Sequence, residues 1–183
     1  MRTEIILSGA GGQGLILAGA ILAEAAGIYE EREVVQTQSY GIQARGGASQ
    51  STVIISDKRI KFPEVRHPDI LLCLSQEAYQ RFSPNLKKGG LLVIDEHLIT
   101  LDLNHEERDV VVLPFTSEAE RLGRRILANL IALGAIAELA KIVKVSSIAR
   151  AIPSRLPERN VPAALEALQV GARLGEINKI IQL

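Results

Sequence analysis

Short apolar runs alternate with helical patterns along the chain, an order typical of α/β folds. Residues 70–74 and 91–94 are continuous apolar runs of the kind found in buried parallel strands. Residues 52–56 and 60–62 flank the short polar link 57–59, which predicts a hairpin and therefore an antiparallel piece in the sheet. Further strands are predicted at residues 4–7, 34–38 and 109–113.

Helical patterns separate these runs and then dominate the last third of the chain. Residues 15–26 are apolar on nearly every side, so we expect this helix to lie between its own sheet and either another helix or a partner subunit, with Gly27 as its cap. Ser117 and Glu120 form a capping box, which predicts a long helix continuing through residues 126–143. Shorter helices are predicted at 76–82, 147–152 and 161–174, the last two separated by prolines.

The length of 183 residues suits one well-buried core, so we predict a single domain over residues 1–183. Its α/β core is expected at 1–116 and its helical C-terminal part at 117–183. The predicted fold class is α/β: a three-layer, Rossmann-like open mixed sheet with helices on both faces.

Composition excludes several classes of protein. Lys and Arg total 21 and Asp and Glu total 21, which argues against a binder of nucleic acid or of an anionic membrane. The nearly uncharged run 126–139 is shorter than the ~20 residues that a membrane-spanning helix needs. The first residues resemble neither a signal peptide nor a transit peptide, so we expect a cytoplasmic protein.

A glycine-rich loop between the first strand and the first helix is the main candidate site. Gly9, Gly11 and Gly14 have the G-x-G-x-x-G spacing, which lets a helix start approach a phosphate. The candidate ligand-binding residues here are Gly9, Gly11, Gly12, Gln13 and Gly14. The alternative is that the glycines only make a tight strand-to-helix corner. NAD binding is disfavoured because the second strand, 34–38, ends without a carboxylate for the ribose.

A second unusual loop, residues 36–49, is polar, glycine-punctuated and carries Arg45 as its one charge. A planar guanidinium and an aromatic ring framed by glycines suit a planar or anionic group, whereas the alternative is a solvated connection. The candidate ligand-binding residues of this loop are Ser39, Tyr40, Arg45, Gly46 and Gly47.

The sequence offers no catalytic set and no metal site. Cys73 is the only cysteine and lies within an apolar run, where it is expected to pack in the core. The three histidines are scattered without carboxylates at metal-ligand spacing. Asp95 follows a buried strand, where it could face a ligand, but we favour a turn or helix-cap role.

Four segments together resemble the gamma subunit of 2-oxoacid:ferredoxin oxidoreductases. They are Gly11-Gly12-Gln13-Gly14 after a first strand, Gln38-Ser39-Tyr40-Gly41, Ala44-Arg45-Gly46-Gly47 and the strand after Pro68-Asp69, and the helical run from Asn129 to Gly134 also matches. The amino-acid sequence of residues 36–40 looks most like that of the 2-oxoglutarate enzymes. Gln43 departs from the Glu expected in many relatives.

The resemblance implies a complex that oxidatively decarboxylates a 2-oxoacid, forms its acyl-coenzyme A and reduces ferredoxin. Thiamine diphosphate, magnesium and iron-sulfur clusters would sit on companion alpha, beta and ferredoxin-like delta subunits, and coenzyme A would contact the glycine loop of this chain. The isolated chain would be inactive. Pyruvate, 2-oxoisovalerate and indolepyruvate remain alternative substrates, and a non-catalytic nucleotide-binding scaffold subunit is the alternative role.

Overall fold

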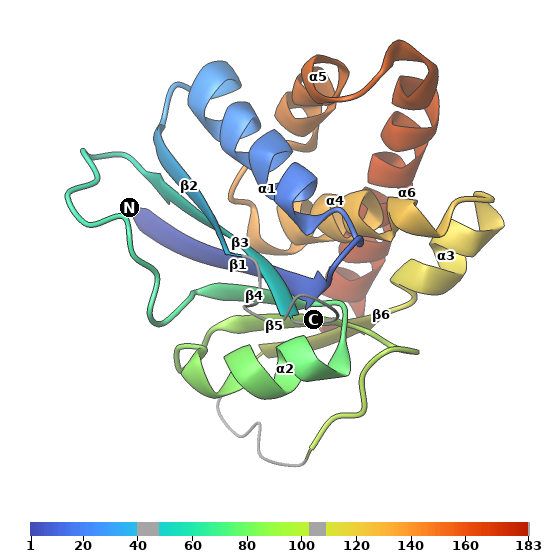
Figure 1. Ribbon diagram of the computed structural model, residues 1–183, viewed down its shortest axis with the longest axis horizontal. Helices are drawn as coiled ribbons and strands as arrows, with labels where there is room; N and C mark the ends of the chain where they lie inside the picture. The colour runs from blue at the N-terminus through green and yellow to red at the C-terminus, as the bar shows by residue number, and fades with distance from the viewer. Residues whose placement is uncertain (40–47, 103–108, 183) are drawn as a thin grey trace.

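The computed structural model describes residues 1–39, 48–102 and 109–182. One six-stranded sheet runs in the order β2-β3-β1-β4-β5-β6 (Figure 1). The strands are β1 (Arg2–Ala10), β2 (Glu33–Ser39), β3 (Ala48–Ser56), β4 (Ile70–Cys73), β5 (Leu91–Asp95) and β6 (Asp109–Leu113). β1, β4, β5 and β6 are parallel, whereas β3 lies antiparallel between β2 and β1, so the sheet is mixed as predicted.

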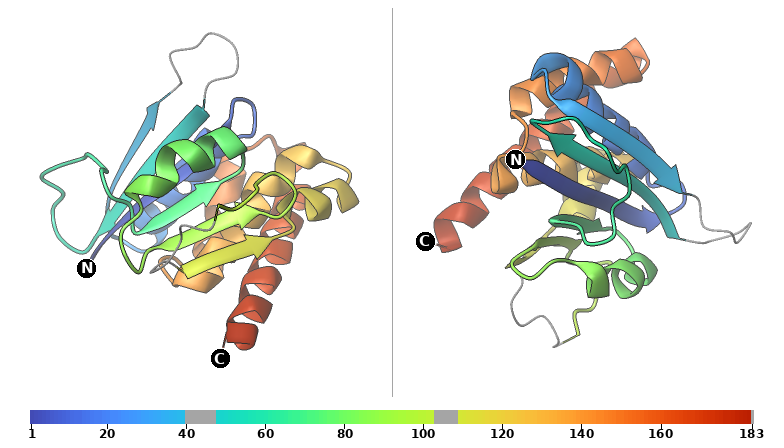
Figure 2. Two further views of the ribbon diagram at one scale, coloured as in Figure 1. Left: turned by 90° about the horizontal axis from the view of Figure 1, so that it is seen from below. Right: turned by 90° about the vertical axis from the view of Figure 1, so that its left-hand side faces the viewer.

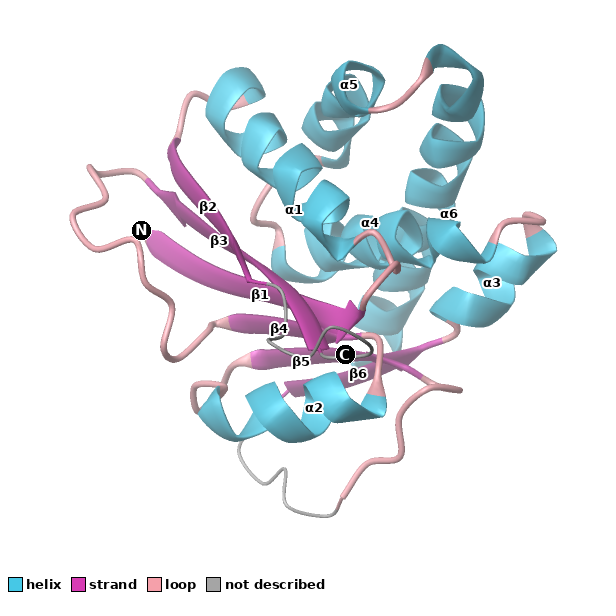
Figure 3. Cartoon of the chain, in the orientation of Figure 1, coloured by secondary structure: helices cyan, strands magenta, loops and turns pink. Residues whose placement is uncertain are grey.

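Helices cover both faces of the sheet and make three layers, which confirms the predicted fold class (Figures 2 and 3). One face packs under α1 (Leu15–Glu24) and α4 (Ala128–Ala140), with α5 (Val145–Arg155) against α1 and α6 (Val161–Gln182) against α4. The other face packs under α2 (Gln76–Phe82). The remaining helix, α3 (Phe115–Arg121), follows β6.

Alternating side chains of β1 pack into the two hydrophobic cores, one on each face of the sheet. Ile5 and Leu7 are fully buried toward α1, while Ile6 is buried toward α2. Since α1 contacts the sheet on one side and α4 and α5 on the other, most of its apolar surface is covered within the chain, although Ile16 and Leu17 stay partly exposed. The all-round apolar pattern of 15–26 is therefore explained by a second helix layer.

The predicted hairpin between 52–56 and 60–62 is wrong. Residues 60–62 form no strand, and the antiparallel partners of β3 are β2 and β1, for example Thr52 opposite Thr37 and Ile6. The hairpin signal failed because strand 52–56 already had partners on both sides. The short run 60–62 therefore could not pair with that strand.

Several helix boundaries also differ from the prediction. The capping box at Ser117 is wrong, because α3 begins at Phe115, and Gly123, at φ 75°, ends that segment before a 3-10 turn at Arg125–Leu127 leads into α4. Gly27 does not cap α1, since the chain continues as a π-helical turn at Ala25–Tyr29. Pro153 lies inside α5 rather than beyond its end.

Candidate functional site

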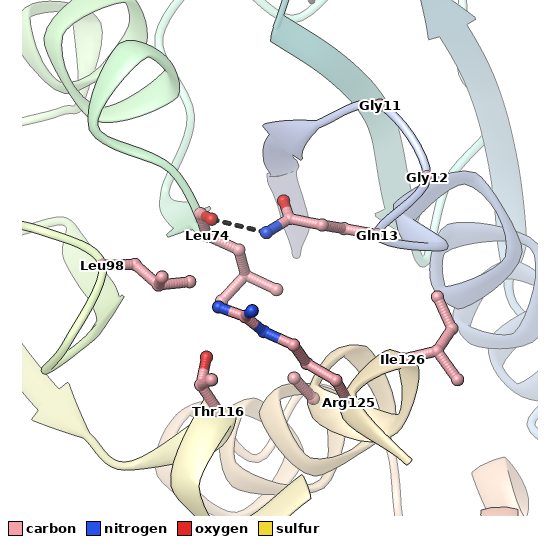
Figure 4. A pocket seen from close by; sticks show the side chains of 9 residues that line it. Gly11, Gly12, Gln13, Leu74, Leu98, Thr116, Arg125 and Ile126 are labelled. Atoms are coloured by element: carbon pink, nitrogen blue, oxygen red, sulfur yellow. Dashed lines mark hydrogen bonds between the residues drawn. The ribbon is translucent and has the colours of Figure 1, made fainter. Parts of the chain in front are cut away.

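A cavity of about 360 Å³ opens at the carboxyl ends of β1 and β4 (Figure 4). These two strands are neighbours and parallel, but the helix after β1 covers one face of the sheet and the helix after β4 covers the other. Such a switch point leaves a crevice above the strand ends, where open α/β sheets bind ligands. The lining residues are Gly11, Gly12, Gln13, Leu74, Leu98, Thr116, Arg125, Ile126 and Ala128.

The glycine loop forms one wall of this cavity. A Cβ atom at Gly11 or Gly12 would meet nothing within 4 Å, so the backbone of both residues faces open space. Gly12 has φ 88° and Gly14 has φ 72°, which are conformations that favour glycine. Gly14 precedes the first turn of α1 without any side-chain cap. The amide N–H groups at this end of α1 are therefore available to an anion.

Gly9 and Gly14 have a packing role instead. A Cβ at Gly9 would lie 2.2 Å from Oε1 of Gln13, and a Cβ at Gly14 would lie 2.3 Å from Nδ2 of Asn129. That Asn129 amide donates to the Gly14 carbonyl at 3.0 Å, which ties α4 to the start of α1. Of the four glycines of this loop, the structure therefore brings Gly11 and Gly12 to the cavity.

Gln13 holds the loop in place. Its Oε1 accepts a hydrogen bond from the Ala10 amide at 2.7 Å, and its Nε2 donates to the Leu74 carbonyl at 2.7 Å (Figure 4). The first bond closes the turn after β1, and the second fastens that turn to the segment after β4. Gln13 lines the cavity, but both ends of its amide are used by the protein.

Arg125 brings to the cavity a positive charge that the glycine loop lacks. It lies on the 3-10 turn before α4, and Figure 4 shows its side chain extending into the cavity toward Leu74. Its side chain is 67% exposed, and its Nε lies 3.9 Å from the carboxylate of Glu120. Nothing in the sequence around residue 125 marks Arg125 as a neighbour of the glycine loop, which lies more than 100 positions earlier in the chain.

Asp95 has a turn-and-cap role, as favoured from the sequence. Its carboxylate is fully buried and accepts from the His97 amide at 2.8 Å and from the Thr116 amide at 2.7 Å. The second bond caps the first turn of α3, where an acceptor is stabilising. Asp95 thereby fixes Thr116, which lines the cavity.

The second candidate loop is only described at its edges. Ser39 is exposed at the end of β2, opposite Gln50 of β3, and is not among the residues that line the cavity. Tyr40, Arg45, Gly46 and Gly47 lie outside the described residues. Gln43 lies in the same segment. Their assignment to a ligand stays a prediction.

Cys73 packs in the core, as expected. It is fully buried, and burial raises the pKa of its thiol to about 12, so the thiolate that a metal or a nucleophilic reaction requires is disfavoured. Within residues 1–39, 48–102 and 109–182, no group of three or more His, Cys, Asp or Glu side chains could hold a metal ion. Over the same residues, no helix is both long and apolar enough to cross a membrane.

Comparisons with known proteins agree on one family. A family model described as pyruvate ferredoxin/flavodoxin oxidoreductase matches residues 4–174. The chain is 48% identical over 181 residues to 2-oxoglutarate synthase subunit KorC of Methanocaldococcus jannaschii, covering 95% of this chain and 96% of that protein. The keto/oxoacid ferredoxin oxidoreductase gamma subunit of Geobacter sulfurreducens superposes with a TM-score of 0.87 at 43% identity, covering 97% of this chain and 98% of that chain.

A more distant structure shares the fold. It is the 2-oxoglutarate:ferredoxin oxidoreductase of Magnetococcus marinus, solved with 2-oxoglutarate, coenzyme A and succinyl-CoA bound. The TM-score is 0.82 at 22% identity, and the match covers 96% of this chain and 31% of that chain. In that enzyme the fold therefore forms about a third of a longer polypeptide.

Proposed function

The chain belongs to the pyruvate ferredoxin/flavodoxin oxidoreductase family as a gamma-type subunit of a 2-oxoacid:ferredoxin oxidoreductase, and on this premise we propose that its complex acts on 2-oxoglutarate. The observation that carries the proposal is the 48% identity to a 2-oxoglutarate synthase subunit over nearly the full length of both chains. The proposed reaction converts 2-oxoglutarate, coenzyme A and two oxidised ferredoxins to succinyl-coenzyme A, carbon dioxide, two reduced ferredoxins and one proton.

The proposed complex contains alpha, beta and ferredoxin-like delta companion subunits and works in the cytoplasm. Thiamine diphosphate with magnesium on a companion supplies the decarboxylation chemistry, and iron-sulfur clusters carry the electrons to ferredoxin. This division of labour is supported by the single, buried cysteine of the present chain, which cannot provide the thiolate set of a cluster. We therefore expect the isolated chain to show no oxidoreductase activity.

The role proposed for this chain is to bind coenzyme A, the substrate that receives the acyl group. Its phosphates would lie at Gly11 and Gly12, where open backbone and the start of α1 favour an anion. Arg125 would add a charge-assisted contact from the facing wall. Leu74, Leu98 and Ile126 give that cavity an apolar side, which suits the methylene-rich arm of the same molecule.

The second loop, residues 36–49, has a proposed role in binding as well. Arg45 is the one charge in residues 36–49, and we propose that it contacts a phosphate, a carboxylate or a partner's acidic group near the active site. Tyr40 and Ser39, together with Gly46 and Gly47, would frame that contact.

The test compares two neighbouring arginines in the assembled complex. Arg125→Ala should raise the KM for coenzyme A by about 5- to 30-fold, the effect of losing a partly exposed contact of about 1 to 2 kcal/mol. The KM for the oxoacid should stay unchanged. Arg124→Ala is the matched control, because the Arg124 guanidinium donates to Asn160 at 3.0 Å and does not line the cavity.

Arg125→Lys should recover part of the loss, since an ammonium keeps the charge but not the planar fork. The coenzyme A role of this cavity fails if Arg125→Ala and Arg124→Ala leave the KM for coenzyme A equally unchanged in complexes of normal composition.

A further inference from the structure

A 13-residue connection between β3 and β4, residues 57–69, protrudes beside the N-terminus (Figure 1, left). We name it the basic loop, after Lys58, Arg59, Lys61 and Arg66. It contains no helix and no strand, and it lies away from the glycine loop, at the opposite end of β1.

The basic loop is held in a fixed shape by backbone and ionic contacts. At its start, the N-terminal ammonium donates to the Asp57 carboxylate at 2.7 Å, and the Asp57 amide donates to the Met1 carbonyl at 3.1 Å. In its middle, Nη2 of Arg2 donates to the Phe62 carbonyl at 2.9 Å. At its end, the Asp69 amide donates to the Glu4 carbonyl at 2.8 Å. These contacts therefore hold the basic loop in one conformation.

The tip of this ordered loop presents an aromatic ring to solvent. Phe62 is 76% exposed, although its own backbone is anchored by Arg2. Exposure of a whole phenyl ring on a rigid support costs free energy in an isolated chain, while such a ring binds a partner with little loss of conformational entropy. Large aromatic side chains of this kind are typical anchors of protein interfaces.

Three cations that are unpaired among the described residues lie within four positions of Phe62 in the sequence. The side chains of Lys58, Arg59 and Lys61 are exposed, and within the described residues none of them makes a hydrogen bond or an ion pair. The acids of the loop are already engaged: Asp57 with the N-terminus and Arg32, Glu64 with Arg66, and Asp69 with Lys87. The charge available to a partner is therefore positive, in a chain whose total charge is zero.

We propose that the basic loop is a docking element for an acidic surface on a companion subunit of the same complex, with Phe62 entering an apolar depression framed by carboxylates. A companion is the expected occupant because the chain belongs to a family of multi-subunit oxidoreductases. A second copy of this chain is disfavoured, because like charges would face each other across the two-fold axis.

The first test maps the contact in the complex purified through a tag on this chain. A carbodiimide joins a lysine amine to a carboxylate only where the two already touch. The proposal requires cross-linked peptides between Lys58 or Lys61 and an Asp or Glu of a companion subunit. Cross-links of these lysines only within the chain, or to a second copy of it, overturn the proposal.

The second test reverses the charge. Lys58→Glu, Arg59→Glu and Lys61→Glu together should lower the amount of companion subunit recovered at about 0.15 M ionic strength by roughly tenfold or more. The matched control reverses three exposed cations on the helical side of the chain that likewise form no ion pair with any residue that the structure describes: Lys144→Glu, Arg159→Glu and Arg173→Glu. The control should keep its companions.

Phe62→Ala removes only the apolar part of the proposed contact. It should lower the amount of companion subunit recovered without changing how that amount depends on salt concentration. Equal recovery with the loop variant and the control overturns the proposal, as does binding of the wild-type loop to nucleic acid or anionic vesicles in place of a subunit. A negative result here leaves the coenzyme A test at Arg125 unaffected, because that test uses the wild-type loop.

Discussion

Gly14→Ala should unfold the chain at a clearly lower temperature than Gly11→Ala, although each substitution adds one methyl group to the same loop. Gly14 has φ 72°, and a Cβ there would lie 2.3 Å from the Asn129 amide nitrogen. Gly11 has open space around its Cβ position and no positive φ. Comparing the two variants therefore separates the effect of backbone strain and crowding at Gly14 from the effect of adding a methyl group to the loop.

The expected magnitude follows from two contributions. A left-handed backbone conformation costs a residue with a Cβ about 1–2 kcal/mol relative to glycine. Moving Asn129 breaks its 3.0 Å bond to the Gly14 carbonyl, and because Asn129 is 97% buried the loss is about 1–3 kcal/mol. The sum is about 2–5 kcal/mol, or roughly 4–20 °C in Tm for a chain of this size.

Thermal or urea unfolding of the two purified variants beside the wild type measures this difference. Gly11→Ala should stay within about 0.5 kcal/mol of the wild type. In the assembled complex, Gly11→Ala should nevertheless raise the KM for coenzyme A, because its methyl group occupies the space proposed for a phosphate. If Gly14→Ala and Gly11→Ala unfold at the same temperature, the reasoning about the corner of the glycine loop is refuted.

Three further predictions concern other parts of the chain. Cys73 should not react with a thiol reagent at pH 8 in the folded chain, because burial raises its pKa to about 12, and it should react fully after unfolding, as mass spectrometry would show. Gly171→Ala should destabilise the chain by several kcal/mol in urea unfolding, since its Cβ would lie 1.8 Å from the Ile131 carbonyl oxygen where α6 crosses α4. Arg45→Ala should leave the unfolding temperature unchanged but lower turnover, or raise the KM for coenzyme A, by roughly ten- to a hundredfold, with partial recovery in Arg45→Lys. Unchanged steady-state kinetics for Arg45→Ala would show that residues 36–49 are a solvated connection.

The parts of the fold that could be predicted from the sequence are those that depend on local patterns of apolar and polar residues. The continuous apolar runs at 70–74 and 91–94 are typical of buried strands, and both were found in the sheet. The nearly all-apolar run 15–26 correctly indicated cover on more than one side, but only the structure shows that the second layer is α4 and α5 of the same chain. Strand partners depend on the whole sheet, so a short polar link at 57–59 was a misleading guide.

The candidate site was predictable only in part, for the same reason. The glycine spacing located one wall of the cavity, but spacing does not distinguish Gly11 and Gly12, which face open space, from Gly9 and Gly14, which pack against side chains. Arg125 approaches from a distant turn, and its place beside Gln13 follows from the packing of α4 on the sheet. No pattern around residue 125 encodes that proximity.

The most direct test of the proposed function is the oxoacid-dependent reduction of methyl viologen by the complex purified through a tag on this chain. We expect reduction with 2-oxoglutarate that requires coenzyme A and yields succinyl-coenzyme A, with much lower kcat/KM for pyruvate, 2-oxoisovalerate and indolepyruvate, and no turnover by the isolated chain. Preference for another oxoacid would contradict the proposed substrate, and turnover of 2-oxoglutarate without any need for coenzyme A would contradict the role proposed for the cavity at the glycine loop.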